Sequence, residues 1–288
     1  MRDLMRKMAG HGSVGLVSRQ SSSLERGKEP MWRSISHDVV NLVGDGITRG
    51  VTLPLPAELA RRLLPVGLEL GPQALTEPGT HPLILYFQSI SNAHLTVPTL
   101  LPNLTYSELV MGVPFSYVTR GPPRSIGRGP FLFMPRLELD NILAMLGGVL
   151  FWGYPKRLTA ISLTERRFMV SGQRGAPMAA LDFDPGGELR PIHGYPAFEP
   201  IRQIMEQPLV SCLPAGVGPC FACSDYKRSW SVAALRPLST VLHIGRGLAR
   251  GLPSGSFAAR GIDLSALGSY ELRAPWRIGP LYPCSSHG

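Results

Sequence analysis

The sequence lacks any apolar run long enough to cross a membrane as a helix. Such a helix needs about 18 or more consecutive apolar residues. The apolar stretch 142–154 is shorter than this and contains Gly147 and Gly148. We therefore expect a soluble, cytoplasmic protein with no membrane partner.

The sequence also has few charged residues and no dense basic run. Asp, Glu, Lys and Arg make up 17% of the chain, although its net charge is +9. A nucleic-acid-binding module usually gathers its basic residues on one face or in one stretch. Here they are scattered, as Arg120, Arg124, Arg128, Arg166, Arg167, Arg246 and Arg250 show. We predict a solvated basic surface and no nucleic-acid partner; only the net charge supports a nucleic-acid-binding module as an alternative.

The four cysteines do not have the spacing of a metal site. Cys220 and Cys223 form a CxxC pair, whereas Cys212 and Cys284 stand alone. A structural zinc site needs four convergent ligands, and a second pair is missing here. Because no signal peptide indicates an oxidising compartment, we expect free thiols rather than disulfides. We expect no metal.

The sequence gives no support to a nucleotide cofactor. Residues 10–15 spell GxGxxG, but residues 1–9 carry Arg2, Asp3 and Lys7 and do not have the pattern of a buried strand. The motif therefore lacks the strand, turn and helix that a dinucleotide site requires. Five histidines occur singly, without a partner at metal-ligand spacing: His37, His81, His94, His193 and His243. We expect no cofactor.

Hydrophobic residues, glycine and proline are abundant instead. The hydrophobic fraction is 44%, with 32 glycines and 28 prolines. This composition is typical of a globular protein with many turns between short strands. A chain of 288 residues can bury a sizeable core. We expect residues 1–30 to be a flexible tail and residues 31–288 to be a single domain.

Short strands dominate the predicted secondary structure. Strands are expected at 82–91, 108–118, 131–137, 158–163, 167–171, 179–183, 231–244 and 270–273, and short helices at 56–64 and near 199–206. Residues 139–150 have the length of a helix, but Gly147 and Gly148 are expected to break it. Because helices do not alternate with the strands, the pattern predicts an α+β fold of mainly antiparallel strands rather than a doubly wound fold.

One lysine has a sequence context that suggests a nucleophile. Residues 152–158 read Trp-Gly-Tyr-Pro-Lys-Arg-Leu, so Lys156 follows an uncharged apolar stretch and precedes Arg157. An ordinary lysine has a pKa of about 10.4 and is almost fully protonated at neutral pH. Burial and a neighbouring cation both lower this pKa. We expect burial to be the larger effect, since a long arginine side chain can turn toward water.

Several motifs around this lysine resemble the acetoacetate decarboxylase family. Leu139-Asp140-Asn141, Gly148 and Tyr154-Pro155-Lys156 have that family's order and spacing. Upstream, residues 64–70 and Tyr106-Ser107-Glu108 look like two further family segments. The resemblance covers residues 45–275, with weaker matching after residue 170. It implies a barrel-like domain with a few short helices, in which Lys156 forms a Schiff base with a β-keto acid.

The resemblance also assigns roles to other residues. Glu108 falls at the family's Tyr-x-Glu position, and we expect it to move protons or orient water. Gln88 stands where the family has a carboxylate, and Arg157 where it has a second lysine. Tyr154 and Trp152 are expected to lie at the substrate pocket.

These features together predict an enzyme that breaks a carbon–carbon bond through a lysine imine. The expected reaction is decarboxylation of acetoacetate or a larger β-keto acid, because Val149 and Leu150 replace charged residues of the family. The alternatives are an imine-using aldolase or dehydratase and a non-catalytic protein that binds small molecules on the same barrel. We expect a homo-oligomer.

Overall fold

The computed structural model describes residues 40–97, 102–120, 125–126, 128–172, 175–213, 220–260 and 268–284. Contacts within the chain separate Met1–Ser36 from His37–Gly288, and every described residue belongs to the second unit. The predicted tail at 1–30 and the GxGxxG motif therefore lie outside the described residues. The single domain at 31–288 stays a prediction.

The described part of the chain consists mainly of strands. Their bounds are β1 Leu42–Pro56, β2 Leu68–Leu70, β3 Thr80–Leu95, β4 Leu104–Arg120, β5 Ser125–Ile126, β6 Phe131–Leu139, β7 Lys156–Leu158, β8 Ala160–Leu163, β9 Arg167–Ser171, β10 Pro177–Pro185, β11 Arg190–Pro191, β12 Leu209–Leu213, β13 Cys220–Ser224, β14 Tyr226–Arg228, β15 Ala234–Ile244, β16 Gly255–Arg260, β17 Ser269–Ile278 and β18 Tyr282–Pro283. The helices are α1 Ala57–Arg61, α2 Ile142–Trp152 and α3 Glu199–Met205.

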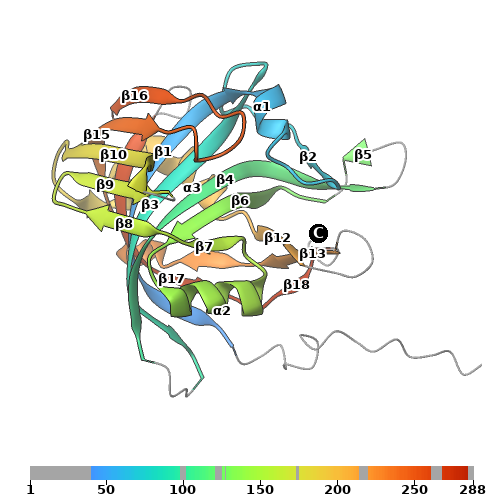
Figure 1. Cartoon of the computed structure of the whole chain (residues 1–288), viewed down its shortest axis with the longest axis horizontal. Coiled ribbons are helices and arrows are strands. Elements are labelled where there is room, and N and C mark those ends of the chain that lie inside the picture. Colours follow the sequence, from blue (N-terminus) through green and yellow to red (C-terminus); the bar gives the residue numbers. More distant parts are fainter. Residues whose placement is uncertain are drawn as a thin grey trace, which may run out of the picture. The chain divides into compact units, whose positions relative to one another are not determined.

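One curved sheet forms the frame of this unit (Figure 1). Strands β17, β1, β3, β4 and β6 follow one another as antiparallel neighbours. Strands β14 and β15 pair with β17 at one end of this row. At the other end, β6 pairs in parallel with β12 and with β7. Strand β12 continues the sheet to β13 and β18.

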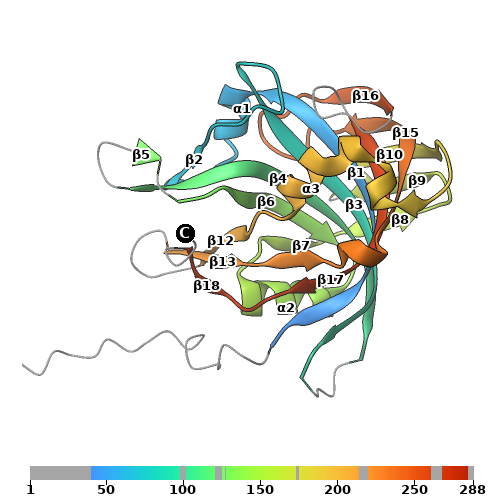
Figure 2. The same cartoon turned by 180° about the vertical axis from the view of Figure 1, so that it is seen from behind.

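A second group of strands packs beside this frame. Strands β8, β9, β10, β15 and β16 pair antiparallel in that order (Figure 2). Strand β15 belongs to both groups, because Ala234–Pro237 pair with β17 and Ser239–Ile244 pair with β16. Between the two groups lies a core that includes Phe87, Phe168 and Leu242.

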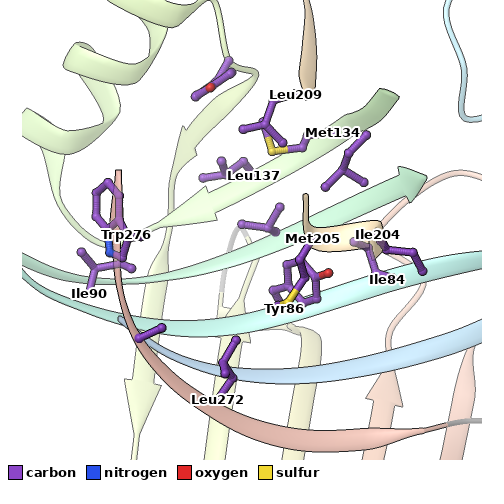
Figure 3. Packing of buried hydrophobic residues seen from close by; sticks show 14 of the residues in the cluster. Ile84, Tyr86, Ile90, Met134, Leu137, Ile204, Met205, Leu209, Leu272 and Trp276 are labelled. Atoms are coloured by element: carbon purple, nitrogen blue, oxygen red, sulfur yellow. The ribbon is translucent and has the colours of Figure 1, made fainter. Parts of the chain in front are cut away.

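A second large core fills the concave side of the curved sheet. Tyr86 and Ile90 of β3, Trp276 of β17 and Met205 of α3 contribute to it, and Figure 3 shows part of this packing. The frame is therefore barrel-like, although among the described residues the strand pairings do not close it. The predicted α+β class with mainly antiparallel strands is confirmed.

The predicted break in the helix at Gly147 and Gly148 is wrong. Helix α2 runs through both glycines. Asn141 caps its N-terminal end, where the Asn141 side chain accepts hydrogen bonds from the backbone amides of Leu143 and Ala144. Gly153 caps its C-terminal end and has a left-handed conformation with φ of 62°. A glycine inside a helix costs only about 1 kcal/mol of stability, and the caps at the two ends offset that cost. The helix therefore continues through both glycines.

Strand β1 was not predicted, and its glycines explain why. Its sequence contains Gly44, Gly46 and Gly50, which interrupt the alternation expected of a strand. A Cβ atom at Gly50 would lie 2.2 Å from the ring of Tyr270. Gly44 and Gly46 face the Trp276 ring in the same way. The glycines therefore make room for aromatic rings of the neighbouring strand β17.

The prediction of free thiols is wrong for two of the cysteines. Cys223 and Cys284 form a disulfide, with their Cα atoms 5.0 Å apart. Pairing of β13 with β18 places Cys223 opposite Tyr282 and so brings the two cysteines together. Local spacing could not reveal this pairing, because 61 positions separate them in the sequence. Cys212 is free.

Candidate functional site

The strand register brings three of the predicted site residues together. Gln88 on β3 lies opposite Glu108 on β4, and Glu108 lies opposite Leu139 on β6. On the other edge of β6, Leu137 lies opposite Lys156 on β7. Residues two apart on a strand share a face, so these side chains gather on the concave side of the sheet.

The end of helix α2 sets the position of Lys156. After Gly153 reverses the chain, the backbone amide of Tyr154 donates to the carbonyl of Gly148. A Cβ atom at Gly148 would lie 2.4 Å from Cδ and Cε of Lys156. The missing side chain of Gly148 therefore lets the lysine stem pack directly against the helix.

Lys156 and Glu108 form a buried pair. Their side chains are 7% and 10% exposed, and Nζ of Lys156 lies 3.8 Å from Oε2 of Glu108. Nζ also lies 5.5 Å from the centre of the Tyr106 ring. Oε2 of Glu108 has no hydrogen-bond partner among the described residues. The two groups therefore depend on each other, and on whatever enters the cavity, for electrostatic compensation.

Burial shifts both groups toward their neutral forms. Burial lowers the pKa of Lys156, and the opposing influence of the Glu108 carboxylate is smaller. Burial raises the pKa of Glu108, and the opposing influence of Lys156 is again smaller. A neutral amine can attack a carbonyl carbon, and a neutral carboxyl group can donate a proton. The pair thus has the protonation tendencies that imine chemistry needs.

These two residues line a cavity of about 50 Å³ beneath the curved sheet. Gln88 and Tyr154, which were predicted from the sequence to lie at a substrate pocket, also line this cavity. Tyrosines 86, 106 and 226 add to its wall, and most of the remaining lining side chains are apolar. Burial raises the pKa of Tyr86 and that of Tyr226 to about 12, so both phenols stay protonated at neutral pH. The cavity suits a small ligand with an apolar part.

The other two predicted site residues lie outside this cavity. Trp152 is buried, and its indole Nε1 donates to the carbonyl of Gly279 at 2.8 Å, which ties helix α2 to the loop after β17. Arg157 is exposed and is not among the residues that line the cavity. Its predicted influence on Lys156 has no counterpart in the causes of that pKa shift, which are burial and Glu108.

Sequence reasoning missed one charged residue of the cavity. Arg228 on β14 is 9% exposed and lines the same cavity as Lys156. The pairing of β14 with β17 places Arg228 opposite Trp276, another lining residue. No motif near Arg228 in the sequence marks it as functional, because it reaches the cavity only through this pairing. The neighbouring aromatics Tyr226 and Trp230 were the only available signal.

A second space, an apolar groove, also reaches Lys156. Its volume is about 220 Å³, and it is lined by residues of α2 and of the β1, β3 and β4 ends. Leu143, Leu146 and Leu150 are among the lining residues from α2, and so is Trp152, which was predicted from the sequence to lie at a pocket. Lys156 and Tyr106 line both the groove and the cavity. The two spaces therefore meet at the lysine.

A separate cluster has the composition of a nucleophilic triad. His243 lies 2.9 Å from Asp182 and 2.8 Å from Ser256 on neighbouring strands β10 and β16. However, the backbone of Ser256 is in register with His243 in the strand ladder, so its local amides serve strand pairing rather than an oxyanion. We interpret the cluster as a cross-strand polar contact. Within the described ranges, no group of three His, Cys, Asp or Glu side chains could hold a metal ion. The same residues include no helix long and apolar enough to cross a membrane.

Comparisons with known proteins agree with the fold. The family model described as "Acetoacetate decarboxylase (ADC)" matches residues 45–198. None of the curated protein sequences matches the chain. Among solved structures, the enduracididine biosynthesis enzyme MppR in complex with pyruvate is 16% identical, with a TM-score of 0.57; the match covers 96% of this chain and 100% of that one.

Two further structures are similar at lower coverage. An acetoacetate decarboxylase from Legionella pneumophila is 13% identical with a TM-score of 0.52, and the match covers 84% of this chain and 85% of that one. An acetoacetate decarboxylase-like enzyme from Sphingomonas wittichii is 14% identical with a TM-score of 0.55, covering 85% of this chain and 93% of that one. At such identities the likeness concerns the fold.

Proposed function

Because the chain belongs to the acetoacetate decarboxylase family, we propose that it is an enzyme that joins Lys156 to the ketone of a keto acid as a Schiff base. The expected reaction is decarboxylation of a β-keto acid. One observation carries this proposal: a buried lysine lies 3.8 Å from a buried glutamate, at the wall of a cavity.

The reaction begins when the neutral Nζ of Lys156 attacks the ketone carbon. Glu108 donates a proton to the departing oxygen, water leaves, and a positively charged iminium forms. The bond between the α-carbon and the carboxylate then breaks, its electron pair moves into the iminium, and CO2 leaves. The resulting enamine takes a proton at carbon, and water hydrolyses the imine to release a ketone and the free lysine.

A second candidate is an imine-using aldolase or dehydratase. The same iminium can form or break a bond to another carbon without losing CO2. A second structure of MppR, 18% identical to this chain with a TM-score of 0.54, is in complex with the condensation product of pyruvate and imidazole 4-carboxaldehyde. A third candidate, a non-catalytic binding protein on the same fold, would keep the cavity and lack turnover.

The apolar groove supports a substrate larger than acetoacetate. It meets the cavity at Lys156, and helix α2 presents leucine and phenylalanine side chains to it. A ketone bound at Lys156 would direct an aliphatic chain into this groove. Each buried methylene contributes about 0.8 kcal/mol, so affinity should rise with chain length.

The predicted homo-oligomer and the cytoplasmic location also stay proposals. Ile142 and Val149 of α2 are 55% and 43% exposed and lie outside the groove lining, which supports a contact between copies. Disulfides persist mainly in oxidising compartments, so the Cys223–Cys284 pair does not support a cytoplasmic location. Blocking thiols at lysis and mapping the disulfide tests the location.

A substrate screen tests the proposed function. Purified protein is offered 3-oxo acids of four to eight carbons, and CO2 release is measured beside a Lys156→Met variant. We expect release that depends on Lys156 and rises along the series. If no acid is decarboxylated but pyruvate forms an imine, the aldolase or dehydratase candidate is favoured. If no ketone forms an imine, the binding-protein candidate remains.

A further inference from the structure

We propose that Arg228 binds the carboxylate of the substrate inside the cavity and so makes the site selective for keto acids over neutral ketones. This inference rests on the proposed function, because it assigns the group that recognises the acid part of the same ligand. It comes from three features of the structure: the burial of Arg228, its aromatic support, and the charge balance of the cavity.

Arg228 is a buried cation without an anionic partner. It is 9% exposed, and none of the ion pairs among the described residues includes it. Its polar contact is a long hydrogen bond, 3.4 Å, from Nη1 to the carbonyl of Met205. An arginine stays protonated in proteins, so the charge persists. A buried charge without a counter-charge is costly, and a bound anion would offset that cost.

Aromatic rings hold the guanidinium in place. Its central carbon lies 4.4 Å from the centre of the Tyr226 ring and 6.0 Å from that of Trp230. The Tyr226 ring is in turn stacked on Trp276, with centres 5.7 Å apart. A guanidinium fixed in this way keeps its planar set of donors, which matches the two oxygens of a carboxylate. The site is therefore organised before any ligand binds.

The charges of the cavity leave room for one negative charge. Its charged lining residues are Lys156, Glu108 and Arg228. The pair of Lys156 and Glu108 sums to zero whether it is an ion pair or two neutral groups, so the cavity carries one uncompensated positive charge. A monoanionic keto acid balances that charge, whereas a neutral ketone does not.

Replacing Arg228 should weaken binding of a keto acid without slowing its decarboxylation. In decarboxylation the carboxylate loses its charge as CO2 forms, so Arg228 holds the ground state more strongly than the transition state. Replacing Arg228 should therefore raise the half-saturating concentration of a keto acid without lowering the rate at saturation. A residue that only supports the fold would not separate the two parameters.

The experiment compares acetoacetate with methyl acetoacetate, which has the same ketone and no charge. Borohydride trapping on Lys156 is measured against ligand concentration for the parent, Arg228→Gln and Arg228→Lys. In Arg228→Gln we expect the half-saturating concentration to rise at least tenfold for the acid, the scale of a lost charge-assisted hydrogen bond, and to stay unchanged for the ester. For the acid, the half-saturating concentration of Arg228→Lys should lie between those of the parent and Arg228→Gln. Lysine keeps the positive charge but lacks the paired donors of the guanidinium.

Three outcomes of the trapping experiment would overturn the proposal. These are equal weakening of acid and ester, no weakening of either, and a parent that traps the ester as readily as the acid. A second readout does not depend on imine chemistry: butyrate should raise the melting temperature of the parent and of Lys156→Met, but not that of Arg228→Gln. If nothing is trapped and butyrate still stabilises through Arg228, the proposed function fails and the carboxylate site stands. If butyrate stabilises Arg228→Gln equally, the carboxylate site fails.

Discussion

Among single residues, Lys156 and Glu108 decide what chemistry the cavity can perform. Each is buried, and each has its pKa shifted toward the neutral form by burial. Their separation of 3.8 Å lets either group serve the other as a counter-charge or as a partner in proton transfer. Arg157, which follows the lysine in sequence, is exposed to solvent. The pKa of Lys156 is therefore set by burial and by Glu108.

Glu108→Gln should reduce turnover and shift the pH dependence of imine formation. Loss of an acid–base group typically slows a reaction by about 10² or more. Because the Glu108 carboxylate raises the pKa of Lys156, its removal leaves burial alone and lowers that pKa further. The midpoint of borohydride trapping against pH should therefore move to lower pH, while trapping itself persists.

Arg157→Gln is the matched control for this measurement. It also removes one charge next to the lysine, but from an exposed side chain outside the cavity. The midpoint should then equal that of the parent. A midpoint that moves more in Arg157→Gln than in Glu108→Gln would show that the exposed arginine, and not the buried pair, governs the lysine.

Among the elements, helix α2 positions the nucleophile. Its last turn, the left-handed Gly153 and the hydrogen bond from Tyr154 to Gly148 lead the chain directly into β7. The Tyr154 hydroxyl also lies 2.6 Å from the Ser224 hydroxyl, which joins this turn to β13. The turn before Lys156 is thus held by hydrogen bonds to helix α2 and to strand β13.

Gly148→Ala should reduce imine trapping, whereas Gly147→Ala should not. At Gly148 the new methyl group would lie 2.4 Å from the Lys156 side chain, so the lysine must move and trapping should fall at least tenfold. At Gly147 the methyl group meets no atom within 4 Å. Alanine there should leave trapping of acetoacetate unchanged and raise stability by up to about 1 kcal/mol, measured by denaturant unfolding. Equal trapping by both variants would contradict the packing of Lys156 on α2.

The elements also show what sequence patterns could and could not predict. Strands β3, β4, β6 and β9 were predicted because each contains a short segment rich in apolar and aromatic residues. Strand β1 was missed, since its glycines are needed only to make room for the rings of Tyr270 and Trp276. Those rings lie on a strand more than 200 positions away in the sequence. The break in α2 was predicted from glycine content alone, whereas its length follows from the caps at Asn141 and Gly153.

For the whole molecule, long-range pairing assembles the cavity. Lys156, Glu108 and Gln88 could be anticipated from local motifs, because those motifs recur in a family. Arg228 could not, because it joins them only through the pairing of β14 with β17. The disulfide between Cys223 and Cys284 was missed for the same reason. Features that depend on contacts between distant strands leave little trace in local sequence.

Disruption of the disulfide should lower the stability of the whole molecule. Closing a loop between positions 61 apart restricts the unfolded chain by about 4 kcal/mol in the chain-entropy model. A reducing agent should therefore lower the melting temperature of the parent, and the Cys223→Ala/Cys284→Ala variant should be insensitive to it. Cys212→Ser, at the free exposed cysteine, should behave as the parent. If alkylation without reduction labels both Cys223 and Cys284, the disulfide is absent.

The most direct measurement is borohydride trapping of a ketone on the intact protein, followed by mapping of the modified residue by mass spectrometry. With acetoacetate present, we predict one irreversible addition, located on Lys156, and none in the Lys156→Met variant. Methionine preserves an unbranched apolar stem in this buried position, so the variant should remain folded, which its melting temperature checks. A folded parent that shows no addition, or an addition that persists in Lys156→Met, would contradict a Schiff base at this lysine.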